Sequence, residues 1–165
     1  MKNKSYNRSK VIEYAQTWAH SRNPQYYNFD ALGGDCTNFA SQCIYAGSGM
    51  MNYSKDNGWY YISGNNKSPS WTGVEFLYRF ITNNKSVGPF GRNSNIEEME
   101  LGDLIQLSFD GVKFAHTLVI VDILGALEPH NILIAAHTDN SLNRRLSSYN
   151  FQKARFIKID GVNIW

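Results

Sequence analysis

Among the residues able to do nucleophilic chemistry, the best placed is Cys36, which follows a glycine pair and Asp35 and opens a stretch with helical spacing. Asp35 is a natural N-cap there, so Cys36 is predicted to lie in the first helical turn. The free N–H groups and positive dipole end of a helix start favour a thiolate. Together with a nearby imidazolium they can lower a thiol pKa from about 8.5 to roughly 3.5–7.5. Cys36 is therefore the candidate nucleophile.

The second cysteine, Cys43, lies two helical turns later on the same predicted face. The two Cα atoms would be about 10 Å apart, which is beyond disulfide reach. Cys43 is expected to be a small buried residue, and Cys36 taken alone could have the same role. The glycine pair, the capping Asp35 and the available histidines distinguish Cys36 from an ordinary core cysteine.

Two histidines lie on consecutive strand-like segments. His116 is near the start of FAHTLVIVDIL, and His137 is near the end of NILIAAHTD. A hairpin centred near residues 126 and 127 would place the two histidines opposite each other. A centre one residue later would pair His116 with Asp139 instead. Either register supplies a general base with an orienting polar partner, and both remain open at this point.

Zinc is an alternative use of these residues, because Cys36, His116 and His137 would form an open three-ligand site. The chain has no close ligand pair such as C-x-x-C or H-E-x-x-H, so we predict no metal and no cofactor. It also lacks a P-loop, a G-x-G-x-x-G segment, a G-x-S-x-G segment and an EF-hand loop, which leaves nucleotide chemistry unsupported. The other histidines, His20 and His130, are expected to be solvated.

Helices are predicted before strands along the chain. The spacing of apolar residues predicts helices over residues 9–20, from residue 36 until Gly47 and Gly49 end it, and around residues 74–81. Strand-like segments follow at residues 103–109, 112–124, 131–139 and 153–160. This order predicts an α+β fold with helices packed on one face of an antiparallel sheet. Residues 49–70 are expected to form surface loops.

The bulk properties are those of a globular protein. A length of 165 residues and 42% apolar content predict a single domain over residues 1–165. The net charge of +2 does not suggest a nucleic-acid partner, and no apolar run is long enough to suggest a membrane span. The basic start has no apolar signal-peptide core. We expect an extracellular or cell-wall location if a leader or further domain was removed, and a cytoplasmic one otherwise; oligomeric state is not predicted.

Four segments carry a family resemblance. In the order GGDCTNFASQC, LGDLIQLSF, FAHTLVIVD and ILIAAHTD, they resemble bacterial putative amidase domains and the related NlpC-type cell-wall peptidases. The resemblance implies a papain-like core that cleaves amide bonds in peptidoglycan stem peptides through a thioester. It assigns Cys36 as nucleophile, His116 as general base and His137 as third polar residue. Tyr27 is similar to a family tyrosine that precedes the cysteine loop. The resemblance also implies that this loop supplies a hydrogen-bond donor to the oxyanion.

The expected function is therefore cysteine-dependent hydrolysis of a peptide or peptidoglycan amide, with a Cys-His-His triad. One alternative is acyl transfer to an amine, which would use the same residues. Another is a non-catalytic module on the same scaffold that binds wall glycan or peptide. Its aromatic contacts would be Trp59, Tyr60, Tyr61 and Trp71.

Overall fold

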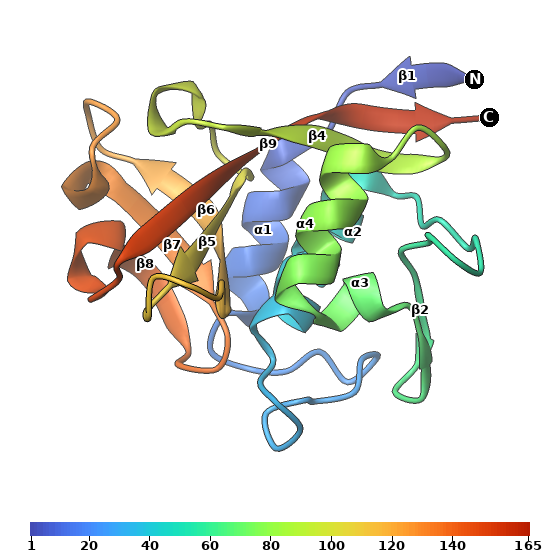
Figure 1. Ribbon diagram of the computed structural model, residues 1–165, viewed down its shortest axis with the longest axis horizontal. Helices are drawn as coiled ribbons and strands as arrows, with labels where there is room; N and C mark the ends of the chain where they lie inside the picture. The colour runs from blue at the N-terminus through green and yellow to red at the C-terminus, as the bar shows by residue number, and fades with distance from the viewer.

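Helices from the first half of the chain lie against an antiparallel sheet made mostly of its second half (Figure 1). The computed structural model describes residues 1–165. The arrangement confirms the predicted α+β class. No helix is long and apolar enough to cross a membrane. The helices are α1 Arg8–Trp18, α2 Cys36–Ser48, α3 Pro69–Thr72 and α4 Val74–Asn83, with 3₁₀ turns η1 Ile96–Glu98, η2 Pro129–Asn131 and η3 Leu146–Ser148.

The main sheet has the strand order β1-β9-β5-β6-β7-β8, and β4 also pairs with β9. All of these pairings are antiparallel. A separate hairpin is formed by β2 and β3. The strands are β1 Lys2–Lys4, β2 Tyr61–Ser63, β3 Asn66–Lys67, β4 Gly88–Ser94, β5 Leu104–Ser108, β6 His116–Ile123, β7 Ile132–Ala136, β8 Ser141–Arg145 and β9 Lys153–Ile164.

The three predicted helices are present as α1, α2 and α4, but the predicted stop at Gly47 is wrong. Helix α2 continues to Ser48 and ends at Gly49, whose φ of 63° is the left-handed conformation that glycine favours. Gly47 has a packing role instead. A Cβ at this position would lie 2.4 Å from Val11 Cγ2, so glycine lets α1 approach α2 closely.

The sheet divides the core into two layers. Leu104, Val119 and Ala135 belong to the apolar cluster that contains the α1 and α2 side chains. Their neighbours along the strands, such as Leu118 and Ile134, belong to a second cluster on the other face. This alternation follows from the two-residue period of a strand.

Residues 49–70 were expected to be surface loops, and this expectation is partly wrong. Trp59 and the following Trp71 are fully buried. Their indole N–H groups donate to Ser41 Oγ at 3.0 Å and Asn38 Oδ1 at 2.9 Å, both on α2. The stretch from β2 to α3 therefore packs onto α2 and contributes to the core, although it contains little regular structure.

Candidate active site

Cys36 is the first residue of α2 and is 8% exposed. The turn before it uses Gly33 and Gly34, whose φ values of 92° and 102° suit glycine. Asp35 is the N-cap residue, but its side chain makes no capping hydrogen bond, so the predicted capping role is wrong. The turn is fixed by other contacts of this carboxylate.

The Asp35 side chain is fully buried and links several segments. Oδ1 accepts from Phe29 N and Asn38 Nδ2, each at 2.9 Å, and Oδ2 is 2.6 Å from His137 Nδ1. Arg22 Nε lies 3.5 Å from the same Oδ2. Burial acts to raise the pKa of Asp35, but the hydrogen bonds from His137, Asn38 and Phe29 outweigh it and lower that pKa. Asp35 is therefore a carboxylate that holds the cysteine loop to β7.

Both ring nitrogens of His137 are engaged. Nδ1 contacts Asp35 Oδ2, and Nε2 lies 2.7 Å from the Trp18 carbonyl oxygen at the end of α1. A carboxylate and a carbonyl can only accept, so both nitrogens must donate and the ring is an imidazolium. It stacks on Phe39 with ring centroids 4.0 Å apart. The structure thus places His137 in a buried ion pair and leaves no ring nitrogen free for His116.

The zinc alternative has no geometric support. His137 already donates through both nitrogens, and the structure contains no group of three His, Cys, Asp or Glu side chains arranged to hold a metal ion. The residues present therefore do not fit the three-ligand site considered from the sequence.

The electrostatic environment of Cys36 differs from the sequence-based expectation. Burial raises the pKa of the Cys36 thiol and the Asp35 charge adds to this, while N–H groups of Thr117 and Thr37 and the Thr37 hydroxyl act in the opposite direction. The helix start therefore does not compensate for desolvation. The direction of the shift is therefore opposite to the lowered pKa that the helix start predicted.

His116 begins β6 and is 7% exposed. Its ring lies beside those of Tyr149 and Phe109, with centroid distances of 5.7 and 6.4 Å. Burial, with a smaller contribution from the nearby Arg144 charge, lowers the pKa of His116 to about 4, and the Asp139 charge acts in the opposite direction. The imidazole is therefore neutral near pH 7 and keeps a nitrogen able to accept a proton.

A neutral buried His116 predicts a loss of stability in acid. The ring takes up a proton near pH 6.5 in an unfolded chain but only at about 4 in the folded protein, so the unfolded state binds more protons between these values. This contribution is complete above about pH 6.5 and is lost as the pH falls toward 4, by up to about 3 kcal/mol.

Urea unfolding at about pH 7 and about pH 4.5 measures the effect. We expect His116→Gln to lose less stability on acidification than the unaltered protein does. Equal losses in both proteins would contradict the buried neutral state.

The starts of α2 and β6 are in direct contact. Thr37 Oγ1 and Thr117 Oγ1, from the residues that follow Cys36 and His116, are 2.9 Å apart. The contact brings the candidate nucleophile and base to the same end of the sheet. Thr117 faces α2, whereas the His116 ring faces Tyr149, and no hydrogen bond joins the sulfur to the imidazole.

Neither predicted hairpin register reaches the histidines. The β6–β7 pairing includes Ile123↔Ile132 near the turn, but a bulge after Ile120 changes it to Val119↔Ala135. Continued toward the site, this second register places Thr117 opposite His137. His116 and His137 consequently project from opposite faces of the sheet and do not face each other.

The two remaining candidates lie on the protein surface. Tyr27 is 49% exposed in the loop before Cys36; its carbonyl oxygen accepts from Asn38 Nδ2 at 3.0 Å, and its N–H donates to the Tyr61 hydroxyl at 2.7 Å. Asp139 follows β7, and its 82% exposed side chain lies 3.1 Å from Arg144 Nη1. Its charge raises the pKa of His116.

Sequence reasoning missed the roles of Thr37, Thr117 and the side chain of Asp35. All are at most 1% exposed. One available signal was the density of polar residues around Cys36 in a helix whose other face is apolar. Because both faces of this helix are buried in the structure, its polar side chains require internal partners.

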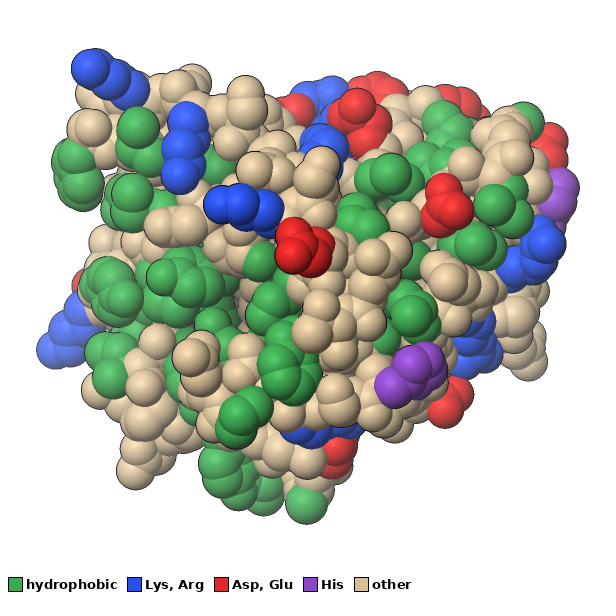
Figure 2. Space-filling view, turned by 180° about the vertical axis from the view of Figure 1, so that it is seen from behind, with side chains coloured by type: hydrophobic (Ala, Val, Ile, Leu, Met, Phe, Trp, Pro, Cys, Tyr) green, Lys and Arg blue, Asp and Glu red, His purple; other side chains and the backbone are tan.

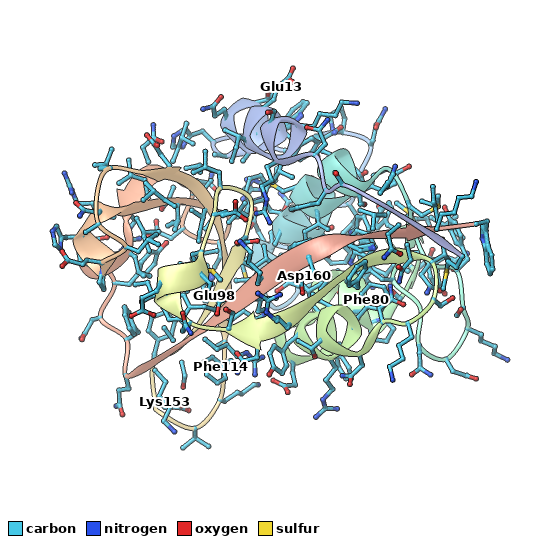
Figure 3. All side chains as sticks on the ribbon, turned by 90° about the horizontal axis from the view of Figure 1, so that it is seen from above. Glu13, Phe80, Glu98, Phe114, Lys153 and Asp160 are labelled. Carbon is cyan, nitrogen blue, oxygen red and sulfur yellow. The ribbon has the colours of Figure 1, made fainter.

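An open groove of about 820 Å³ adjoins the cysteine turn. Its lining includes Gly33, in the turn before Cys36, and Ala115, the residue before His116. Phe114 also lines it and is labelled in Figure 3 at the same end of the sheet as Lys153. A larger groove between residues 52–58 and α4 contains no candidate site residue. Neither Cys36 nor His116 lines either groove, but the smaller groove includes Gly33 of the cysteine turn and Ala115, the residue before His116, so it is the one that adjoins the candidate site.

Comparison with known proteins adds a family match. The model of the putative amidase domain matches residues 5–159. The uncharacterized protein YhbB of Bacillus subtilis strain 168 is 34% identical over 119 residues, which cover 70% of this chain and 37% of that protein. The match thus spans little more than a third of that relative. No solved structure matches the chain.

Proposed function

This chain belongs to the putative amidase domain family, and on that premise we propose that it is a cysteine-dependent amidohydrolase. Family membership indicates amide hydrolysis in general. The observation that supports a cysteine mechanism is the placement of Cys36 at the start of α2, in contact through Thr37 and Thr117 with the start of β6, where His116 lies. We further propose a papain-like core related to that of NlpC-type peptidases, because a helix bearing the nucleophile packs on an antiparallel sheet bearing the histidine.

The proposed reaction begins from a neutral thiol and a neutral imidazole. His116 accepts the thiol proton as Sγ attacks the amide carbonyl, and the Cys36 backbone N–H donates to the developing oxyanion. His116 then protonates the leaving amine as the C–N bond breaks, which yields a thioester. Water deprotonated by His116 hydrolyses the thioester and restores the thiol. The His116 ring must turn toward the sulfur, since catalytic hydrogen bonds often form fully only with substrate bound.

The proposed substrate is a peptide or peptidoglycan amide. The groove beside Gly33 and Ala115 is open to solvent and has apolar side chains in its lining, including Phe76, Val112 and Phe114. These features suit an extended chain better than a small enclosed ligand. Acyl transfer to an amine would use the same residues up to the thioester, so identification of the product distinguishes it from hydrolysis.

Trapping the thioester tests the proposal directly. Muropeptides or synthetic stem peptides are mixed with the protein, the reaction is quenched in acid, and the intact mass is measured. We expect an added acyl mass that peptide mapping assigns to Cys36. Product formation without any covalent intermediate at this residue would contradict the cysteine mechanism.

We propose Asp139 as the third residue, because its charge raises the His116 pKa while His137 is occupied by Asp35 and Trp18. We expect Asp139→Asn to lower kcat/KM about tenfold, a modest effect since the side chain is 82% exposed and solvent screens its charge. The acid limb of the pH profile should also move to lower pH, because a charge that raises the His116 pKa is lost.

Asp122→Asn is the matched control for this prediction. Asp122 lies at the far end of β6, and its exposed carboxylate accepts only from the neighbouring Ile123 N–H. Steady-state rates over a pH series should be unchanged in this variant. Full activity and an unshifted acid limb in Asp139→Asn would remove Asp139 from the site.

The binding-module alternative loses two of its four aromatic contacts. Trp59 and Trp71 are fully buried and cannot touch a glycan or peptide. Hydrophobic side chains do gather on the side of the molecule that contains β2 (Figure 2). The exposed ones from this region include Tyr53 and Ile62, which were not among the predicted contacts. No specific observation favours binding without catalysis.

A further inference from the structure

A continuous series of hydrogen bonds leads from β9 to the sulfur of Cys36. Its members are Arg155, Gln106, Thr117, Thr37 and Cys36, from β9, β5, β6 and α2. Gln106, Thr117 and Thr37 are at most 1% exposed. Solvent therefore cannot supply alternative partners to the three central residues, and their donors and acceptors can be assigned one by one.

The orientation of the Gln106 amide is determined by its neighbours. Arg155 Nε and Nη2 donate to Oε1 at 2.8 and 2.6 Å, and a guanidinium can only donate. The amide nitrogen donates to the Val74 carbonyl oxygen at 2.9 Å and to Thr117 Oγ1 at 3.2 Å. Both amide protons are thus used. If the amide were reversed, its nitrogen would face the Arg155 donors and its oxygen would face the Val74 carbonyl oxygen.

The direction of the next hydrogen bonds follows from this orientation. Thr117 Oγ1 accepts from Gln106, so its single proton is available for its other partner, Thr37 Oγ1, at 2.9 Å. The Thr37 hydroxyl oxygen accepts this hydrogen bond from Thr117. Its own proton can then be donated to Cys36 Sγ, which lies 3.8 Å away. Every bond in the series therefore points from the Arg155 cation toward the sulfur.

We propose that Thr37 is a further catalytic residue, whose hydroxyl donates a hydrogen bond to the Cys36 thiolate as it forms. Gln106 and Thr117 are positioning residues that set the direction of that hydroxyl. The proposal rests on the proposed function only in taking Cys36 as the nucleophile. A hydrogen bond to an anion is stronger than one to a neutral thiol, so it stabilises the reactive form selectively. The thiol proton still goes to His116, and Thr37 keeps its own.

The test compares Thr37→Val with Thr37→Ser in a Cys43→Ala background, where Cys36 is the only thiol. Iodoacetamide alkylation and the ultraviolet absorbance of the thiolate are followed against pH. We expect Thr37→Val to raise the apparent thiol pKa by about one pH unit and to slow alkylation at about pH 8 roughly tenfold, with Thr37→Ser close to the reference protein. An unchanged profile in Thr37→Val, or an equal loss in Thr37→Ser, would overturn the proposal.

Gln106→Glu tests the direction of the series. A carboxylate at this position can only accept, so Thr117 would donate to it, Thr37 would donate to Thr117, and the sulfur would lose its hydroxyl donor. We expect a rise in thiol pKa similar to that in Thr37→Val. In a Thr117→Val background the reversal cannot pass to Thr37, so the effect of Gln106→Glu should disappear. A persistent effect would indicate charge acting through space and would overturn the positioning role.

These measurements need no substrate. An absence of hydrolysis would count against the proposed function while leaving the effect on thiol acidity intact, and an unchanged thiol pKa in an active enzyme would count against Thr37 alone. Circular dichroism melting shows whether each variant is folded. Because Gln106→Glu and Thr117→Val change β5 and β6 whereas Thr37→Val changes α2, the test does not depend on one variant folding.

Discussion

Replacing Cys36 by alanine is expected to reduce kcat/KM for amide hydrolysis by at least about 10³-fold, because the covalent route through a thioester is lost. Cys36 is the sole sulfur at the junction of α2 and β6, where Thr37 contacts Thr117. The residual groups around it cannot form the intermediate. Mass spectrometry of muropeptide or stem-peptide digests over time measures the rate.

The matched control is Cys43→Ala. Cys43 lies on the same helix and is fully buried, but it belongs to the apolar core and not to the site. We expect this variant to keep kcat/KM within about twofold while losing about 1 kcal/mol of stability from reduced packing. Full activity in Cys36→Ala, or equal losses in both variants, would show that the reaction does not use this thiol.

The second large effect is expected on stability. Asp35→Asn removes the charge from a fully buried ion pair and leaves the His137 imidazolium without its carboxylate. Breaking such a pair by removing one partner costs about 3–5 kcal/mol, because the remaining charge is buried and uncompensated. Urea unfolding at neutral pH should show this loss in the free energy of unfolding. Activity should fall at least as far as the folded fraction does, since the same carboxylate holds the loop before Cys36.

Asp30→Asn provides the control. Asp30 also pairs with Arg22, at 2.9 Å, but its side chain is 41% exposed. Exposed ion pairs contribute about 0–1 kcal/mol, so this variant should be close to the unaltered protein. If Asp35→Asn were as mild as Asp30→Asn, the buried pair with His137 would not be a main support of the site.

Together the two experiments separate neighbouring residues of the Gly-Asp-Cys turn. The proposed chemistry belongs to Cys36, whereas Asp35 joins the turn to β7 and, through His137, to the end of α1. A histidine can resemble a catalytic residue in sequence and still have this structural role, since both uses require a buried ring with defined partners.

The helical and strand periodicities were sufficient to predict the α+β class and most of the central elements. They predicted α1, α2 and α4, and the strands β5, β6, β7 and β9, because these carry the apolar faces that form the core. Strand β4 was missed because its sequence, GPFGRNS, is rich in glycine and polar residues. Its pairing with β9 is a tertiary contact that local sequence preference does not reveal.

By itself, the sequence determined that a cysteine opens a helix after two glycines, that His116 begins a strand and that His137 lies at the end of the next one, because these conclusions depend on local spacing; the strand itself ends at Ala136, one residue earlier than His137. Only the tertiary structure decided how those residues are used. The bulge after Ile120 shifts the β6–β7 register and separates the two histidines onto opposite faces of the sheet. Burial, a property of the assembled core, raises the pKa of Cys36 where an isolated helix start would lower it.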